Sequence, residues 1–181
     1  IDALTQMADG IAIVVGSPSI NPVPAGKDLY NSAYFLADQE IKYVQHKALL
    51  PTYDIFDEYR YFEPASQFDL IEYKGKKIAL TVCEDIWDVA EENPLYTFQP
   101  LDKICSSQPD LIINVSASPF SYNHAEERLA ICKENVDRYK IPLFYSNNVG
   151  AQTELIFDGG SVVMSPNGVI HREMPYFEET L

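Results

Sequence analysis

The stretch "FDLIEYKGKKIALTVC", from Phe68 to Cys83, predicts two β-strands joined by a turn at Lys74-Gly75. A two-residue turn that contains Gly is a common hairpin signal, because Gly adopts positive φ without steric cost. The second strand is almost wholly apolar, which is typical of a strand buried on both faces. It ends in a thiol that two carboxylates follow at once, in "CEDIW".

Further strands are expected on both sides of this hairpin. "IAIVVGSP" (Ile11 to Pro18) predicts a strand covered on both faces, "DLIINVSASPF" another buried strand, and "PLFYSNN" a short one. "LYNSAYFLADQEIKYVQHK" predicts a hairpin about Asp38-Gln39, and "ELIFDGGSVVMSPNGVIHRE" closes with a hairpin about Pro166-Asn167-Gly168. The sequence therefore predicts many strands, some joined as hairpins and others joined through a helix.

Helices are expected in three places. "IDALTQMADG" is typical of the last turns of a helix closing at Asp9-Gly10, "PLYTFQPLDKICSSQ" after Asn93 predicts a second, and the third begins near Asn123 and runs to about Lys140. One face of the third helix carries Leu129, Cys132, Val136 and Tyr139. We predict an α/β fold in which two sheets stack in the middle and helices cover them outside.

Composition limits the class of protein. The 181 residues suit a single domain, 1–181, and a formal net charge of −14 opposes binding to nucleic acid or to an anionic membrane. No apolar run approaches the roughly 20 residues of a membrane helix. Three cysteines without C-x-x-C spacing argue against disulfides and against a metal site, which favours a cytoplasmic location.

Polar residues follow the apolar strands in four clusters, "KALLPTYDIFDEYRYF", "CEDIWD", "NVSASPF" and "SNNVGAQTELIFDGG". The ends of strands are where open α/β sheets present their sites. Cys83 is either a nucleophile or an inert core thiol. Lys47 is either the cation that offsets the acids after Cys83 or a solvated edge lysine. Glu58 either holds a lysine or accepts a proton, or it forms a surface ion pair with Arg60.

The acids after Cys83 are poorly placed to be its base, because neighbouring side chains in a strand point to opposite faces. We expect Glu84 and Asp85 to begin a helix, with the Glu84 backbone N–H available to an oxyanion. The rival hypothesis is a Cys-His thiol enzyme, in which a histidine is the base. His46 should face away from Lys47 and His171 lies in the closing hairpin, so His124 remains the open candidate. Ser116 and Ser118 lack the G-x-S-x-G frame of a serine hydrolase.

Taken together, the blocks "KALLPTYDIFDEYRYFEP", "VCEDIW", "NVSASPF" followed by "EERL", and "LIFDGGSVV" resemble the nitrilase superfamily of carbon–nitrogen hydrolases. More narrowly, they resemble the glutaminase domains of glutamine-dependent NAD synthetases. The resemblance implies a four-layer αββα sandwich and a Glu-Lys-Cys triad. It implies Cys83 as nucleophile, Lys47 as triad lysine, Glu58 as a supporting glutamate and the Glu84 amide as an oxyanion donor.

The resemblance also implies that Tyr53 and Ser118 contact a glutamine substrate. Where the family has Gly-Lys or Gly-Arg after "SASPF", this chain has Asn123 and His124, so His124 stands in the place of the basic substrate contact. The family's general base lies in an "FPE" motif before the first long strand, and no such motif occurs here. We therefore expect the first strand and helix of the sandwich, and the catalytic Glu, to lie upstream of residue 1.

Three hypotheses follow from these features. The first is a glutaminase domain whose parent uses ATP and Mg²⁺ in a separate synthetase domain, with no cofactor in this part and with the isolated chain nearly inactive. The second is an amidase or nitrilase acting on another substrate, and the third is a non-catalytic module that keeps the fold. Expected partners are glutamine, the synthetase domain of the same parent and further copies of the chain in a homo-oligomer.

Overall fold

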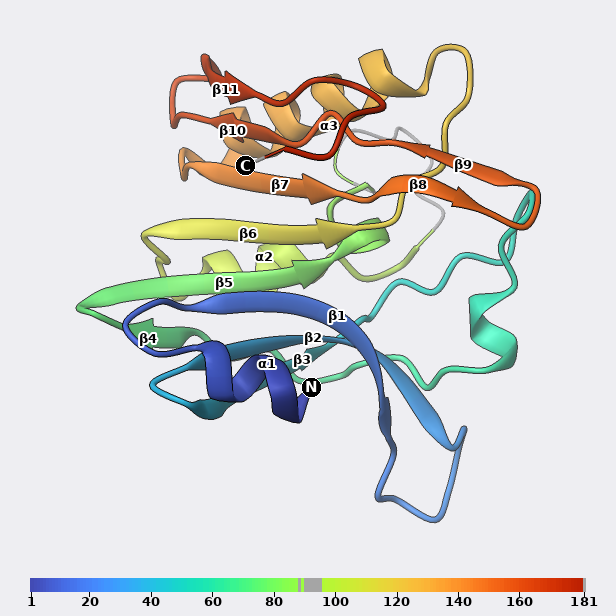
Figure 1. Cartoon of the computed structure of the whole chain (residues 1–181), viewed down its shortest axis with the longest axis vertical. Coiled ribbons are helices and arrows are strands. Elements are labelled where there is room, and N and C mark those ends of the chain that lie inside the picture. The colour runs from blue at the N-terminus through green and yellow to red at the C-terminus, as the bar shows by residue number, and fades with distance from the viewer. Residues whose placement is uncertain (88, 90–95, 181) are drawn as a thin grey trace.

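The computed structural model describes residues 1–87, 89 and 96–180 (Figure 1). Within these residues the strands form a three-stranded sheet, a six-stranded sheet and a two-stranded ribbon. The first, in the order β1-β2-β3, is antiparallel and contains β1 (Ile13–Ile20), β2 (Leu29–Ala37) and β3 (Glu40–His46). Asp38 and Gln39, both at positive φ, make the predicted turn between β2 and β3.

The six-stranded sheet has the order β11-β10-β7-β6-β5-β4 and is parallel only between β5, β6 and β7. Its strands are β4 (Ile71–Tyr73), β5 (Lys76–Val82), β6 (Leu111–Ser116), β7 (Leu143–Asn147), β10 (Val162–Met164) and β11 (Ile170–Glu173). The predicted hairpins β4-β5 and β10-β11 are both present. The sequence did not predict the ribbon of β8 (Val149–Gln152) and β9 (Leu155–Asp158).

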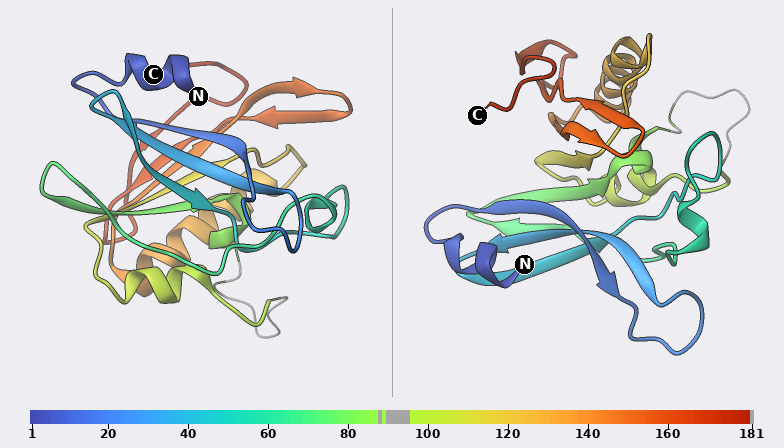
Figure 2. Two further views of the ribbon diagram at one scale, coloured as in Figure 1. Left: turned by 90° about the horizontal axis from the view of Figure 1, so that it is seen from below. Right: turned by 45° about the vertical axis from the view of Figure 1, so that its right-hand side comes forward.

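The helices lie outside the sheets (Figure 2). α2 (Pro100–Cys105) and α3 (His124–Tyr139) cover one face of the six-stranded sheet, and the three-stranded sheet packs on the other face. α1 (Asp2–Met7) contacts β2 and β3, on the opposite side of the molecule from α2 and α3. This layering agrees with the predicted α/β sandwich.

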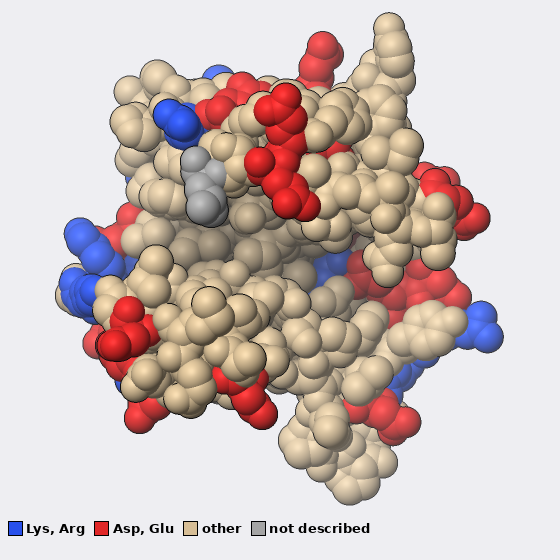
Figure 3. All heavy atoms as spheres, in the orientation of Figure 1, with Lys and Arg blue, Asp and Glu red and all other residues tan. Residues whose placement is uncertain are grey.

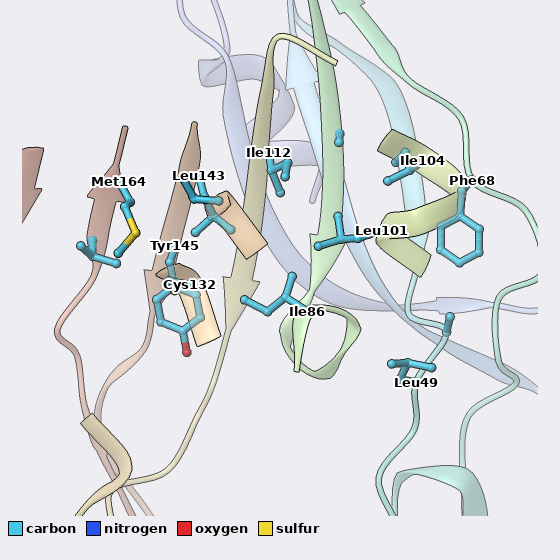
Figure 4. Close-up of a cluster of buried hydrophobic side chains, with 14 residues drawn as sticks. Leu49, Phe68, Ile86, Leu101, Ile104, Ile112, Cys132, Leu143, Tyr145 and Met164 are labelled. Carbon is cyan, nitrogen blue, oxygen red and sulfur yellow. The ribbon is translucent and has the colours of Figure 1, made fainter. Parts of the chain in front are cut away.

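Alternation along β5 creates two cores. Ile78, Leu80 and Val82 pack against β2, whereas Ala79 faces the helices, because successive side chains of a strand point to opposite faces. Figure 4 shows the helix-side core, which is formed by Leu49, Phe68, Ile86, Leu101, Ile104, Ile112, Cys132, Leu143, Tyr145 and Met164. Cys132 and Val136 of the predicted apolar face of α3 are buried here.

Two predictions about individual elements were wrong. β1 is at the edge of its sheet and its residues are half-buried or exposed, so this run is not covered on both faces. The helix predicted after Asn93 is confirmed only from Pro100 to Cys105, because residues 96–99 are not helical and residues 93–95 lie outside the described part of the chain. In both places a local apolar pattern was mistaken for a larger buried element.

The motif "FDGGS" leads from β9 to β10 and is tied to α3. Arg128 Nη2 donates to Asp158 Oδ2 at 2.6 Å, and both side chains are buried. Gly159 and Gly160 follow at positive φ, and a side chain at Gly160 would collide with the ring of Tyr176. These residues fix the turn between the ribbon and the six-stranded sheet.

Replacing Leu80 by Ala should lower the free energy of unfolding by about 2–5 kcal/mol. Leu80 is fully buried between the two sheets, so its loss removes apolar burial and leaves a cavity. Urea denaturation of the purified chain measures the change. The matched control is Ile20→Ala, at a side chain that is 81% exposed, and equal losses in the two variants would contradict the described core.

Candidate active site

Cys83 lies just beyond the end of β5, not within it as the sequence suggested. β5 ends at Val82, and Cys83 opens a single 3₁₀ turn, η2 (Cys83–Ile86), with φ at +45°. A left-handed backbone at a residue other than Gly costs about 1–2 kcal/mol and is found at sites where the surroundings impose it. The turn brings the thiol to the edge of the sheet, where it lines a pocket.

Asp85 fixes this turn with its carboxylate. Its Oδ2 accepts from the Val82 N–H at 3.1 Å, and its Oδ1 accepts from the Ala48 and Leu49 N–H groups at 3.0 and 2.9 Å. Burial raises the pKa of Asp85 to about 6, although the three N–H donors and the charge of Lys47 oppose that rise. The sequence predicted a helix start here, and the structure contains one 3₁₀ turn.

Lys47 follows β3 and is almost fully enclosed. Its side chain is 1% exposed, and Nζ donates to Glu58 Oε1 at 2.6 Å. Burial lowers the pKa of Lys47, whereas the Glu58 carboxylate raises it through its charge and its hydrogen bond, and the net pKa is raised. Lys47 is therefore a buried ammonium group, and the alternative of a solvated edge lysine does not describe it.

Glu58 lies in the 3₁₀ turn η1 (Glu58–Arg60) and is held from two sides. Besides the bond from Lys47, its Oε2 accepts from Asn31 Nδ2 at 3.1 Å. Arg60 contacts Asp57 at 3.6 Å, so Glu58 does not form the surface pair with Arg60 that was the alternative. Sequence reasoning missed Asn31, because nothing distinguishes it from other polar residues in a strand.

The thiol of Cys83 is surrounded by opposing charges. Burial raises its pKa, Lys47 lowers it, and Glu84 and Glu58 raise it again, so that the net pKa is above that of an ordinary thiol. The charge of Lys47 therefore does not produce a resting thiolate. A thiol in this setting attacks only when a base removes its proton as the reaction proceeds.

The pocket beside Cys83 has a volume of about 250 Å³. It is lined by Tyr53, Asp54, Ile55, Phe56, Cys83, Glu84, Trp87, Ser118, Pro119, Phe120, Ser121, His124 and Leu155. Four segments that are separate in the sequence thus meet, and they include four of the predicted site residues besides Cys83. Lys47 and Glu58 are not among the described residues that line the pocket, but their charges act on the thiol.

The side chain of Glu84 forms one end of the pocket. Its Oε1 accepts from the Tyr53 hydroxyl at 2.6 Å and from the Tyr96 hydroxyl at 3.3 Å. Burial raises the pKa of Glu84, and the bond from Tyr53 opposes that rise. Sequence reasoning considered only the backbone N–H of Glu84. This N–H is in the first turn of η2, where such groups have no intrahelical acceptor.

Ser118 and His124 form another part of the wall. His124 Nε2 lies 3.0 Å from Ser118 Oγ, Nδ1 lies 3.1 Å from Glu127 Oε2, and the imidazole stacks on Trp87 with ring centroids 4.9 Å apart. His124 is the only basic side chain among the described residues that line the pocket. Both ring nitrogens have partners other than the thiol, so the Cys-His arrangement gains no support.

The other two histidines do not line the pocket. His46 stacks on Tyr30 and its Nδ1 lies 2.8 Å from Ser32 Oγ, away from Lys47 as expected, whereas His171 lies in β11. Ser116 donates to Asn114 Oδ1 at 2.7 Å and lowers the pKa of the Cys83 thiol by a side-chain contact.

Asn147, a residue that sequence reasoning did not single out, holds Ser118 in place. Its Oδ1 accepts from the Ser118 N–H at 2.9 Å, and its Nδ2 donates to the carbonyl groups of Ser118 and Gly159 at 3.3 and 2.9 Å. The Asn147 side-chain amide thus bonds to both the N–H and the carbonyl group of Ser118, as the backbone of a neighbouring strand would. The signal was present in "SNN" at the end of a strand, but it did not identify which residue Asn147 would bind.

Other kinds of site find no counterpart in the described residues. These residues include no group of three His, Cys, Asp or Glu side chains that could hold a metal ion. In the same part of the chain, no helix is both long and apolar enough to cross a membrane.

Comparisons with known proteins give a consistent result. No family model matches the chain. The glutamine-dependent NAD(+) synthetase of Synechocystis sp. is 39% identical over 181 residues, covering 97% of this chain and 32% of that protein. A solved glutamine-dependent NAD+ synthetase from Acinetobacter baumannii, in complex with ADP, is 30% identical with a TM-score of 0.86, covering 99% of this chain and 32% of that one.

A carbon–nitrogen hydrolase from Helicobacter pylori G27 shares the fold at 22% identity. Its TM-score is 0.76, over 96% of this chain and 61% of that one. The chain spans about a third of the length of the synthetases that it matches.

Alkylation of Cys83 by iodoacetamide should have a pH midpoint above about 8.5, the ordinary thiol pKa. Burial raises the pKa of the thiol, and Lys47→Met, which removes the charge that lowers it, should move the midpoint further up. Mass spectrometry of the Cys83 peptide between pH 6 and 10 measures the rate. Lys42→Met, on the more exposed part of β3, should leave the midpoint unchanged; a downward shift in Lys47→Met would contradict the described electrostatics.

Proposed function

Since the chain is homologous to the glutamine-dependent NAD(+) synthetases over about a third of their length, we propose that it is the glutaminase part of such an enzyme. The observation that carries this proposal is the Cys83 thiol at the pocket wall together with the Lys47–Glu58 pair, whose charges act on it. The proposed reaction is hydrolysis of glutamine to glutamate and ammonia. The ammonia would amidate deamido-NAD elsewhere in the parent enzyme.

In the proposed reaction Cys83 Sγ attacks the side-chain amide carbon of glutamine and its proton passes to a general base. We propose that the Lys47 ammonium and the Glu84 backbone N–H stabilise the oxyanion of the tetrahedral intermediate. The C–N bond then breaks, ammonia leaves with the proton from the base, and a thioester remains on Cys83. Water attacks the thioester, which releases glutamate and restores the thiol.

The general base is proposed to come from a segment outside the 181 residues. The acids whose charge acts on the thiol are Glu84 and Glu58, and within the described residues both are bonded to other groups. A groove of about 420 Å³ runs beside β1 and is lined by Val14, Val15, Gly16, Val115, Ser116 and Ser146, among others. A further strand pairing with the open edge of β1 would pass along this groove towards Ser116 and Cys83.

The polar groups of the pocket suit the two charged groups of an amino acid. The Glu84 carboxylate and Tyr53 hydroxyl are proposed to bind the α-ammonium group, and Ser118 and His124 the α-carboxylate. A volume of about 250 Å³ is below the roughly 300–1,000 Å³ typical of drug-sized ligands, which fits a small metabolite. His124 would make a weaker carboxylate contact than Lys or Arg, because an imidazole ring offers fewer N–H donors than an ammonium or a guanidinium group.

The proposal also assigns partners. The synthetase part of the parent would receive the ammonia and would be where ATP and Mg²⁺ act, in the cytoplasm. We further propose a homo-oligomer, because the chain exposes large apolar side chains such as Ile20, Val23 and Phe144. The acidic side chains spread over the face in Figure 3 favour a partner surface that is not itself strongly acidic.

Adding the upstream segment of the gene to the chain should raise glutaminase turnover about 10²- to 10⁴-fold, the usual contribution of a general base. Ammonia release from glutamine is measured for the 181-residue chain and for the extended protein, with extended Cys83→Ala as the inactive control. Equal turnover by the two active forms would show that the base lies within these 181 residues. Hydrolysis of other amides but not glutamine would favour the amidase alternative.

In the extended protein, His124→Lys should lower the KM for glutamine and His124→Asn should raise it, each by about tenfold, with kcat changed much less. One charge-assisted hydrogen bond to the substrate carboxylate is gained or lost, and tenfold corresponds to about 1.4 kcal/mol. Steady-state kinetics at pH 7.5 measures both constants. Lys133→Asn, at an exposed position of α3, is the control, and unchanged KM in both His124 variants would remove His124 from the substrate site.

A further inference from the structure

The two groups proposed to act on the substrate carbonyl belong to different sheets. Cys83 follows β5 of the six-stranded sheet, and Lys47 follows β3 of the three-stranded sheet. The apolar contacts between the two sheets are non-directional, so they do not by themselves fix one backbone segment against another. A directional contact is therefore needed to hold the ammonium at a constant distance from the thiol.

Asp85 makes this directional contact. It is 3% exposed, and its two carboxylate oxygens accept three backbone N–H bonds of 2.9 to 3.1 Å. Only the bond from Val82 belongs to its own turn. The other two come from Ala48 and Leu49, the two residues that directly follow Lys47.

The arrangement exceeds what capping of a short turn requires. A capping acid normally accepts from one or two N–H groups of its own helix. Asp85 instead uses one whole oxygen for the segment after Lys47, and Lys47 itself is held in line by its own N–H bond to the Asn31 carbonyl at 2.8 Å. The Asp85 carboxylate thus connects the backbone next to Cys83 with the backbone next to Lys47.

We propose that Asp85 is a positioning residue that sets the separation of the Lys47 ammonium from the Cys83 thiol. Its part in catalysis rests on the proposed function, but the separation itself does not. Asp85 is not among the described residues that line the pocket, and its carboxylate bonds to the main chain on both sides. It would be needed for turnover and not for substrate binding.

A purely electrostatic role for Asp85 predicts the opposite effect on the thiol. Removing a negative charge from the neighbourhood of Cys83 favours the thiolate and lowers the pH midpoint of alkylation. Loosening the Lys47 segment moves the Lys47 ammonium away from the thiol and raises the pH midpoint of alkylation. The sign of the change therefore separates the two roles.

The first experiment uses Asp85→Asn in the extended protein. The amide can accept from Ala48 and Leu49 only if its NH₂ faces the Val82 N–H, so at least one bond is lost. We expect the alkylation midpoint of Cys83 to rise by about one pH unit, in the range for loss of an opposite charge. We expect kcat to fall about 10²-fold, as for a misplacement of about 1 Å, with KM within about threefold. A midpoint that falls or does not move overturns the proposal.

A second variant keeps every charge in place. Replacing the Leu49 peptide N–H by an ester oxygen, with the α-hydroxy analogue of leucine, removes one of the three bonds and leaves the carboxylate intact. The midpoint should rise by a smaller amount and kcat should fall about tenfold. This variant decides the matter if Asp85→Asn does not fold, and a midpoint equal to that of the unmodified protein overturns the proposal.

The matched control is Asn135→Ala. Asn135 is 1% exposed, and its Nδ2 donates to the Ile86 carbonyl at the end of the same turn, but it does not bond to the Lys47 segment. It should lower the urea midpoint of unfolding while leaving the alkylation midpoint unchanged, and an equal shift in both variants would reduce Asp85 to a general stabiliser. Alkylation needs no glutamine, so absence of glutaminase activity in the unmodified protein would refute the proposed function and leave this test intact.

Discussion

Parallel pairing of β5, β6 and β7 is the constraint on which the candidate site depends. In this register Val82 lies level with Val115, and Val115 lies level with Ser146. The next residues along the three strands are Cys83, Ser116 and Asn147, so a thiol, a hydroxyl and an amide lie at the same edge of the sheet. A shift of one residue in any pairing would turn these side chains to the opposite face, because the side-chain period of a strand is two. The apolar alternation of β5 between two cores fixes the register, so the packing of the fold also places its polar groups.

The electrostatics of the site follow from burying a single ammonium among several acids. Lys47 lies near the carboxylates of Glu58 and Asp85, and both favour its charged form. The thiol is kept neutral, because burial and the nearby glutamates outweigh the lysine. The resting state therefore differs from a thiolate–imidazolium pair, in which the nucleophile is already ionised. In the proposed reaction the lysine would meet negative charge that appears on the substrate, and it would therefore stabilise the transition state more than the resting state.

Much of the fold could be predicted from local patterns. The turns at Asp38-Gln39 and Lys74-Gly75 followed from residues that tolerate positive φ between alternating strands, and the apolar face of α3 followed from its period. The exposure of β1 could not be predicted, because it depends on which strands lie beside it and not on its own residues. The ribbon β8-β9 was missed for a related reason: its strands are short and largely exposed, so they carry little apolar alternation.

In the candidate site, too, local sequence indicates some residues, whereas others are identified only by the fold. Cys83, Lys47, Glu58, Tyr53, Ser118 and His124 stood out as polar residues after strands or through the family resemblance, and the structure brings them to one place. Asn31, Asn147 and the carboxylate of Asp85 did not stand out, because each acts on a backbone or side chain more than 20 positions away. Local sequence carries the identity of the reactive groups. The partners that hold them are defined only when the chain is folded.

The left-handed backbone at Cys83 has a consequence for how such a protein changes under selection. Glycine would adopt the same φ without steric cost, so the residue that costs least in backbone strain at this position has no reactive side chain. Laboratory evolution for heat resistance alone would therefore reward loss of the reactive sulfur. A screen that also demands turnover would retain it. Cysteine in this conformation thus carries a cost in stability, which the proposed role of its thiol would offset.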